Sequence, residues 1–177
     1  MDYISPKEVA DNMLTTAVNK AHLSVKDLLI RGALSGSLLA ISVTLAIMAT
    51  TQTNLSLIGA LVFPVGFIII ILLGLELVTG SFALIPLAWL EKQISGKIML
   101  YNLFWVFLGN LIGSVSFAML LWATNLGTAE ITSLGSIEQS LVQISEKKTI
   151  GYGAHGSSGL IAAFVKAILC NWMVCMG

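Results

Sequence analysis

The sequence contains few charged residues, which occupy only 10% of its 177 positions. Soluble domains carry about a quarter charged residues, so this shortage, combined with 56% hydrophobic residues, excludes an ordinary water-soluble enzyme. The nine basic and nine acidic residues cancel, and this balance gives no indication of a nucleic-acid partner. The composition therefore predicts an integral membrane protein.

Histidine and cysteine are also scarce, with two of each in the chain. Cys170 and Cys175 lie five residues apart in an apolar run. On a helix their side chains would point well away from each other, so we expect free thiols rather than a disulfide. The sequence shows no cluster of metal ligands, no nucleophile–base pair and no phosphate-binding glycine loop. We expect neither an enzyme nor a cofactor or metal site.

Long apolar runs divide the chain into expected membrane spans. A hydrocarbon core about 30 Å thick requires roughly 20 helical residues. An amphipathic helix at 5–24, opened by a Ser5-Pro6-x-Glu8 capping box, is expected inside a cytoplasmic segment at 1–27. The rest, 28–177, is expected to be a channel domain that belongs to the all-α membrane class. Its spans are expected at about 28–49, 55–90, 98–123 and 159–177, with a short linker at 50–54 and a loop at 151–159.

The second span is too long for one straight helix. Its 36 residues would extend roughly 54 Å, and Glu76 is its only ionisable residue. Irregular backbone and a carboxylate at membrane depth are tolerated only when they are buried in protein or line a cavity. We therefore predict a helical bundle whose second helix is broken at 74–81 and lines a substrate path. Gly74 and Gly80 permit this break.

Two roles are open for Glu76. Its carboxylate could hold the broken segment through hydrogen bonds to backbone N–H groups, which is the interpretation we favour. The alternative is a proton relay.

Other polar residues interrupt the apolar runs. Asn110 is expected to join helices by hydrogen bonds, within a Gly109-x-x-x-Gly113 spacing that favours close helix contact. Lys166 and Asn171 are costly in lipid and are expected to face protein or water, although Lys166 could instead extend toward the interface. Phe63 and Phe67 share a helix face and form either a constriction or a lipid-facing pair.

The orientation follows from the distribution of basic residues. Six of nine lie near or before the first span and between the second and third spans. Loops rich in Lys and Arg stay in the cytoplasm. We expect a cytoplasmic N-terminus and an external polar stretch at 124–158.

Four motifs together resemble the formate/nitrite transporter family, and the likeness runs in order from Ser5 to Gly177. They are Phe-x-x-Gly-Phe (63–67), Gly-Leu-Glu-Leu-Val-Thr-Gly (74–80), Gly-Asn-Leu-Ile-Gly (109–113) and Lys-Ala-Ile-Leu-Cys-Asn-Trp-Met-Val-Cys (166–175). The resemblance implies a homopentamer in the inner cell membrane, with a pore in each protomer. It implies transport of small monovalent anions such as formate or nitrite, either passive or proton-coupled. It also implies an aquaporin-like helical bundle of six spans in two inverted repeats.

The resemblance assigns site residues position by position. It places Phe63, Phe67, Leu77, Val78, Thr79 and Asn171 along the substrate path. A lysine of the family's vestibule corresponds to Lys147 or Lys148. Lys166 matches the first position of the fourth-span motif.

The sequence departs from the family pattern at its end. The second broken helix and its pore histidine are expected beyond residue 177, so the chain is interpreted as truncated within the fourth of six spans. A hydrosulfide or lactate channel on the same scaffold is an alternative. A non-conducting membrane scaffold is a further alternative if the truncation is native.

Overall fold

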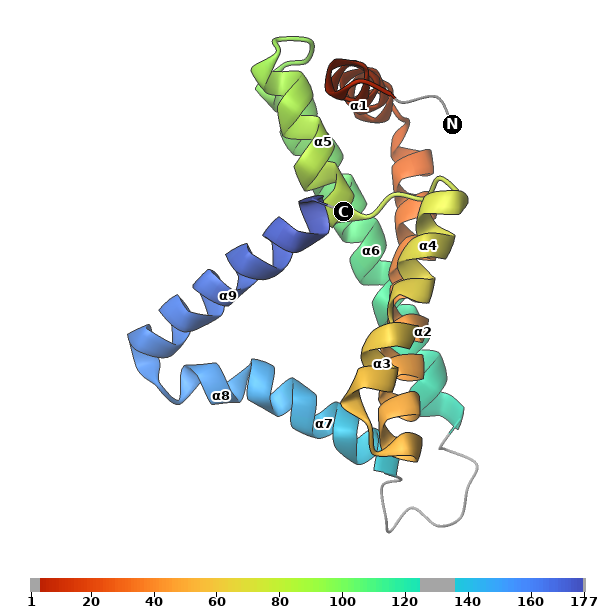
Figure 1. The fold of residues 1–177 in the computed structure, drawn as a ribbon, viewed down its shortest axis with the longest axis vertical. Coiled ribbons are helices and arrows are strands. Elements are labelled where there is room, and N and C mark those ends of the chain that lie inside the picture. Colours follow the sequence, from red (N-terminus) through yellow and green to blue (C-terminus); the bar gives the residue numbers. More distant parts are fainter. Residues whose placement is uncertain (1–3, 125–135, 177) are drawn as a thin grey trace. The chain divides into compact units, whose positions relative to one another are not determined.

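The computed structural model describes residues 4–124 and 136–176, and every regular element in these ranges is a helix. The prediction of an all-α protein is therefore confirmed (Figure 1). The helices are α1 (Pro6–Ala21), α2 (Val25–Thr53), α3 (Ser56–Val62), α4 (Pro64–Leu72), α5 (Val78–Leu90), α6 (Gly96–Thr124), α7 (Ser136–Lys148), α8 (Ile150–Gly153) and α9 (Gly156–Met176).

Three helices of the described ranges are long and apolar enough to cross a membrane. They are α2, α6 and the Gly156–Met173 part of α9. The second expected span is divided into the shorter apolar helices Ser56–Leu72 and Val78–Leu90, as the break requires.

Two expected loops are helical instead. The linker expected at 50–54 was wrong, because α2 continues to Thr53 and only Asn54 and Leu55 separate it from α3. Asn54 makes this turn with a φ of 56°, a conformation that asparagine tolerates better than most residues. The loop expected at 151–159 was also wrong, since α8 and the start of α9 occupy it. Residues 125–135 of the polar stretch lie outside the described residues.

The chain forms two compact units, which are described separately. Unit 1 comprises the chain up to Leu38 together with Ile70–Ser116, and unit 2 comprises Leu39–Ile69 together with the chain from Phe117 onward.

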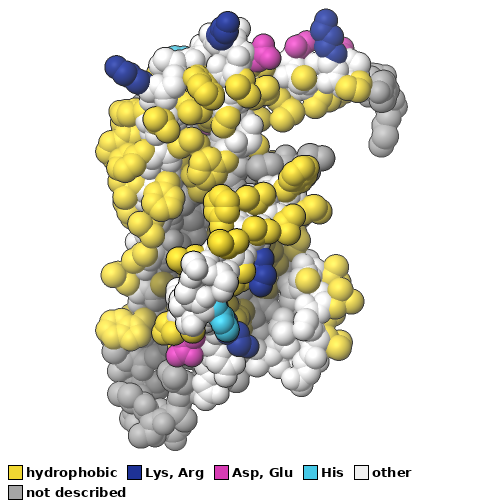
Figure 2. Space-filling view, turned by 90° about the vertical axis from the view of Figure 1, so that its left-hand side faces the viewer, with side chains coloured by type: hydrophobic (Ala, Val, Ile, Leu, Met, Phe, Trp, Pro, Cys, Tyr) yellow, Lys and Arg dark blue, Asp and Glu magenta, His cyan; other side chains and the backbone are white. Residues whose placement is uncertain are grey.

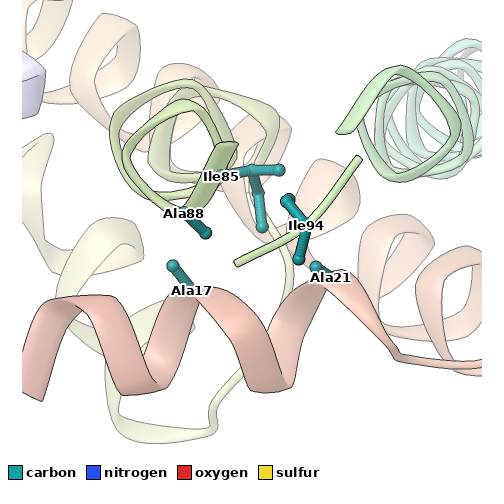
Figure 3. Close-up of a cluster of buried hydrophobic side chains, with 5 residues drawn as sticks. All are labelled: Ala17, Ala21, Ile85, Ala88 and Ile94. Atoms are coloured by element: carbon teal, nitrogen blue, oxygen red, sulfur yellow. The ribbon is translucent and has the colours of Figure 1, made fainter. Parts of the chain in front are cut away.

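In unit 1, α1 lies across α5, and small side chains allow the two helices to approach closely. Ala17 and Ala21 of α1 meet Ile85 and Ala88 of α5, and Ile94 closes the cluster from the turn after α5 (Figure 3). All five side chains are buried. This cluster fixes α1 against the membrane-embedded part of the unit.

The N-terminus of α1 has the predicted capping box. The Glu8 backbone N–H donates to Ser5 Oγ at 3.3 Å, and the Ser5 backbone N–H donates to Glu8 Oε2 at 2.8 Å. At the start of a helix these two backbone N–H groups have no helical carbonyl as acceptor, and the two side chains supply one for each. The capping box predicted from the sequence is confirmed.

The first half of α2 and the first half of α6 touch through their backbones. A β-carbon on Gly32 would lie 3.1 Å from the Cα atom of Gly109. A β-carbon on Gly36 would overlap the backbone of Asn110, and one on Gly113 would overlap the backbone of Ala33. The close contact predicted from the glycine spacing is confirmed.

In unit 2, two glycines again permit tight turns. Gly59 of α3 lies against Thr50 and the carbonyl of Ala46, so α3 folds back closely on the end of α2. Gly159 of α9 lies against the carbonyl of Tyr152 in α8. Both turns leave no space for a side chain.

Candidate functional site: the break in the second span

The break comprises the non-helical residues between α4 and α5. Gly74 follows α4 with a φ of 61°, and its N–H donates to the Ile71 carbonyl at 3.0 Å. The Leu75 N–H donates to the Ile70 carbonyl at 3.0 Å. These two bonds form a Schellman motif, in which glycine is favoured because other residues are strained at positive φ. Gly74 therefore ends α4.

The predicted break at 74–81 was too long at its C-terminal end. Leu77 is extended and α5 begins at Val78, so Val78, Thr79 and Gly80 belong to the first turn of a helix. The apolar stretch of α5, with alanine and leucine, favours a helix as soon as the chain can start one.

Asn110 of α6 holds both sides of the break. Its Nδ2 group lies 2.9 Å from the carbonyl oxygen of Glu76 and 2.9 Å from that of Gly32. Its Oδ1 atom accepts the Val78 backbone N–H at 2.9 Å. Ser35 of α2 adds a hydrogen bond from its Oγ to the same Glu76 carbonyl. Backbone groups that a continuous helix would have paired are thus bonded by side chains.

The Glu76 carboxylate forms an ion pair with Lys20 of α1. Lys20 Nζ lies 2.9 Å from both Oε1 and Oε2. The Glu76 side chain is only 2% exposed and that of Lys20 is 24% exposed. The prediction that this carboxylate bonds backbone N–H groups was therefore wrong. Its charge is compensated by Lys20, which lies 56 positions earlier in the chain.

Lys20 is itself held by α6. Asn102 is fully buried and donates from Nδ2 to the Lys20 backbone carbonyl at 2.8 Å. This carbonyl lies in the last turn of α1, where it also accepts the Leu23 backbone N–H at 3.3 Å. The bond from Asn102 fixes the base of the lysine side chain while its ammonium group reaches Glu76.

Sequence reasoning missed Lys20 and Ser35 as parts of this network. Asn102 was visible as a polar residue in an apolar run, which is the usual sign of a bonded side chain. Lys20 gave no local signal, because a basic residue on an amphipathic helix normally faces water.

The remaining predicted residues are distributed over both units. Leu77, Val78 and Thr79 lie half-buried beside Glu76, and Gly80 is exposed. In unit 2, Phe63 and Phe67 contact each other edge to face, with ring centroids 5.4 Å apart. Lys147 and Lys148 are exposed at the end of α7.

On α9, the two predicted polar residues have local partners. Lys166 Nζ lies 5.3 Å from the ring centroid of Tyr152. Asn171 Nδ2 donates to the Ala167 carbonyl at 2.9 Å within the same helix. Both side chains are exposed in unit 2.

A metal centre has no basis in the described parts of the chain. Within 4–124 and 136–176, no three His, Cys, Asp or Glu side chains are grouped so that they could hold a metal ion. The charge of Glu76 is balanced by a protein cation.

A buried, bonded break in an apolar helix is the arrangement expected of a membrane transport protein, and a family comparison identifies which kind. The model of the "Formate/nitrite transporter" family matches residues 7–177. The chain belongs to the formate/nitrite transporter family. With its three candidate spans, this formate/nitrite transporter family member is a multi-pass membrane protein.

Known relatives of this family member are transporters and channels. The chain is 30% identical to the uncharacterized transporter YrhG of Bacillus subtilis, with 99% of this chain and 64% of YrhG aligned. It is 28% identical to the formate channel BtFdhC of Bacillus thuringiensis, with 99% and 66% aligned. It is 29% identical to the formate channel FocA of Haemophilus influenzae, with 98% and 59% aligned. The chain thus spans about two thirds of the length of the first two relatives.

Proposed function

We propose that the protein conducts small monovalent anions such as formate or nitrite through a pore in each protomer. The observation that carries this proposal is the ion pair at the break, in which Lys20 lies 2.9 Å from Glu76. A lone buried carboxylate would repel an approaching anion, whereas a compensated one leaves the local charge near zero. The formate channels among the relatives support the choice of substrate.

The start of α5 supplies an electrostatic reason for anion passage. The N-terminus of a helix carries roughly half a positive charge, and α5 begins at the break with Val78 and Thr79. A partial charge of this size attracts an anion without holding it as firmly as a full cation would, and conduction requires such weak binding. We assign Leu77, Val78 and Thr79 to the substrate path on this basis.

The other path residues are assigned by the family motif. Phe63 and Phe67 would form an apolar constriction, and Asn171 would line the path from α9. A bare anion loses its hydration at an apolar ring, so passage as the neutral acid is favoured there and transport would be coupled to protons. Lys147 or Lys148 would attract anions at the external mouth.

We also propose the setting in which this pore operates. The protein would be a homopentamer in the inner cell membrane with its N-terminus in the cytoplasm. The excess of Lys and Arg before α2 and between α5 and α6 supports this orientation.

The test is anion flux through the full-length protein in liposomes, measured with formate and nitrite at several pH values. Replacing Thr79 by Val removes a hydroxyl from the first turn of α5 while preserving its shape. We expect a change in flux of about fivefold, since one hydrogen bond contributes on the order of 1 kcal/mol, with unchanged assembly. Thr15→Val, on the exposed side of α1, is the matched control.

Three outcomes would count against parts of the proposal. Equal flux in Thr79→Val and Thr15→Val would remove Thr79 from the path. Flux of hydrosulfide or lactate in preference to formate and nitrite would change the substrate. An assembled protein that passes none of these anions would be a membrane scaffold.

A further inference from the structure

The turn after α5 contains a lysine where the protein elsewhere uses glycine. The Lys92 N–H donates to the Trp89 carbonyl at 3.0 Å, and the Gln93 N–H donates to the Ala88 carbonyl at 2.9 Å. This is the same Schellman motif that ends α4, where Gly74 has a φ of 61°. Lys92 occupies the equivalent position with a φ of 57°, although a side chain is strained there. A residue other than glycine at such a strained backbone position suggests that its side chain has a function.

This turn is anchored and not loosely attached. Ile94, two residues after Lys92, is only 7% exposed and packs in the cluster with Ala21 of α1 (Figure 3). Lys97 follows in the first turn of α6. The two lysines are therefore displayed from fixed backbone on both sides of a buried residue. Glu91 is the one acidic residue among 89–105, so this segment has a net charge of +1, from two lysines and one glutamate.

Aromatic side chains continue the surface from Lys97 along α6. Tyr101 and Phe104 are 51% and 58% exposed, and their spacing of three residues places them on the same side of α6. Trp105 lies edge to face against both rings, with centroids 6.1 Å from Tyr101 and 5.3 Å from Phe104. This aromatic group lies one to two helical turns after Lys97 along α6.

A second indole lies at the other side of the turn. A β-carbon on Gly96 would be 3.4 Å from Nε1 of Trp89, so the Trp89 ring is next to the start of α6. The Trp89 side chain is 45% exposed. Lys92, Lys97 and the aromatic residues Trp89, Tyr101, Phe104 and Trp105 are called the lysine–aromatic face below.

The length of α6 sets the depth of this face in the bilayer. Its 29 residues extend roughly 44 Å at about 1.5 Å per residue, whereas the hydrocarbon core is only about 30 Å thick. At least one end of α6 therefore reaches headgroup depth, and the charge of Lys97 assigns its first turns to that level, with Phe104 and Trp105 just beneath. Figure 2 shows that charged side chains, Lys and Arg together with Asp and Glu, are outermost at the end of unit 1 where α1 lies, and that hydrophobic side chains cover the surface beneath them.

We propose that the lysine–aromatic face binds an anionic phospholipid of the leaflet on the α1 side. Lys92 and Lys97 would contact the headgroup phosphate, Trp89 and Tyr101 would lie at the level of the ester groups, and Phe104 and Trp105 would pack on the acyl chains. The occupant follows from charge and depth together, because basic side chains at a membrane surface attract anionic lipids and Trp and Tyr favour this interface. The inference requires only a membrane-spanning protein and does not rest on the transported substrate.

The test compares lipid binding to the full-length protein in detergent micelles by native mass spectrometry. The probes are phosphatidylglycerol and phosphatidylcholine with identical acyl chains. We expect Lys97→Gln to reduce the preference for phosphatidylglycerol about fivefold, since one basic residue near a charged surface contributes on the order of 1 kcal/mol. Lys7→Gln, which removes an exposed lysine from α1, is the matched control and is expected to leave the preference unchanged.

Lys92→Gly separates lipid binding from fold stability. Glycine relieves the positive φ, so we expect the thermal midpoint in lipid-free detergent to rise by about 2–4 °C. The preference for phosphatidylglycerol is expected to fall about fivefold in the same variant. A purely structural lysine would not give these opposite changes.

Three results would overturn the proposal. The first is an equal phosphatidylglycerol preference in the Lys92→Gly/Lys97→Gln double variant and in Lys7→Gln. The second is displacement of the lipid by millimolar inorganic phosphate, which would indicate a site for a free anion. The third is efficient disulfide formation between two chains carrying Tyr101→Cys in liposomes, which would show that a second copy covers this face.

Discussion

The polar residues at the break and those on α9 both interrupt apolar helices, but they find very different partners. At the break, Glu76 is 2% exposed and is bonded to a residue 56 positions away. On α9, Lys166 and Asn171 are exposed, and Asn171 bonds only four residues back along its own helix. The first set joins α1, α2 and α6 to the break, whereas the contacts described for the second set lie within α8 and α9.

This difference shows what a buried polar group requires. An unpaired charge in a low-dielectric interior is expensive, so Glu76 can be buried only because Lys20, Asn110 and Ser35 compensate its carboxylate and its carbonyl. An exposed polar residue with a partner close to it in the sequence does not need side chains from distant helices. The two regions should therefore respond very differently to substitution.

The largest expected effect is the loss of the cation at the break. Lys20→Met leaves the Glu76 carboxylate buried without compensation, and removing one partner of a buried ion pair costs about 3–5 kcal/mol. We expect a reduction of about 3 kcal/mol in the free energy of unfolding, measured by denaturation in mixed micelles. The partial exposure of Lys20 places the value at the lower end.

The double variant Lys20→Met/Glu76→Met tests the cause. An ion pair replaced by apolar residues of similar size is often neutral in stability, so most of the loss should be recovered. If the double variant is no more stable than Lys20→Met, the loss comes from packing of α1 and not from the unpaired carboxylate.

A smaller effect is expected from filling a glycine contact. Gly36→Ala would push a methyl group into the Asn110 backbone, and overpacking costs about 1–3 kcal/mol. Gly80→Ala is the control, because a β-carbon there meets nothing within 4 Å. Alanine in a helix is favoured over glycine by up to about 1 kcal/mol, so this variant should be equal or more stable. The measurement is the thermal midpoint of unfolding of both variants. An equal decrease of the midpoint in Gly80→Ala and Gly36→Ala would contradict this explanation.

Substitutions on α9 are expected to have a smaller effect still. Lys166→Met removes the contact with Tyr152, and an exposed contact of this kind contributes about 0.5–1 kcal/mol. Asn171→Leu removes a bond within the helix and should change stability by a similar amount. Losses in the full-length protein as large as that of Lys20→Met would mean that α9 has buried polar partners beyond those found within 136–176.

The smallest effect concerns the start of α1. Hydrogen bonds from the Ser5 backbone N–H and, secondarily, from its hydroxyl lower the pKa of the Glu8 carboxyl below its ordinary value. A lowered pKa stabilises the folded helix above the ordinary value, and this stabilisation is lost as the pH falls through the folded value. Hydrogen exchange of the first turn of α1 should therefore accelerate in acid. Glu8→Gln should exchange at a rate independent of pH over this range, after correction for the intrinsic exchange rate.

Much of the fold follows from local sequence, whereas the site depends on distant contacts. The apolar runs predicted the long helices, and Ser5 and Glu8 predicted the start of α1, since both signals act within a few residues. The end of the break at Val78 could not be predicted, because Asn110, 32 positions later, bonds the first N–H of α5. The Glu76–Lys20 pair was missed for the same reason. No periodic pattern relates a lysine on an amphipathic helix to a carboxylate in another span.

The bond between Asn102 and the Lys20 carbonyl has a consequence for how the protein is made. Synthesis proceeds from the N-terminus, so Lys20 leaves the ribosome long before Glu76 and 82 positions before Asn102. Insertion of a glutamate alone into the bilayer is disfavoured by a few kcal/mol. Here Lys20, which compensates the charge of Glu76, has been synthesised before Glu76 enters the membrane. The N-terminal helix gains this bond only once α6 has been inserted. Its docking is therefore complete only after the first three spans have been assembled.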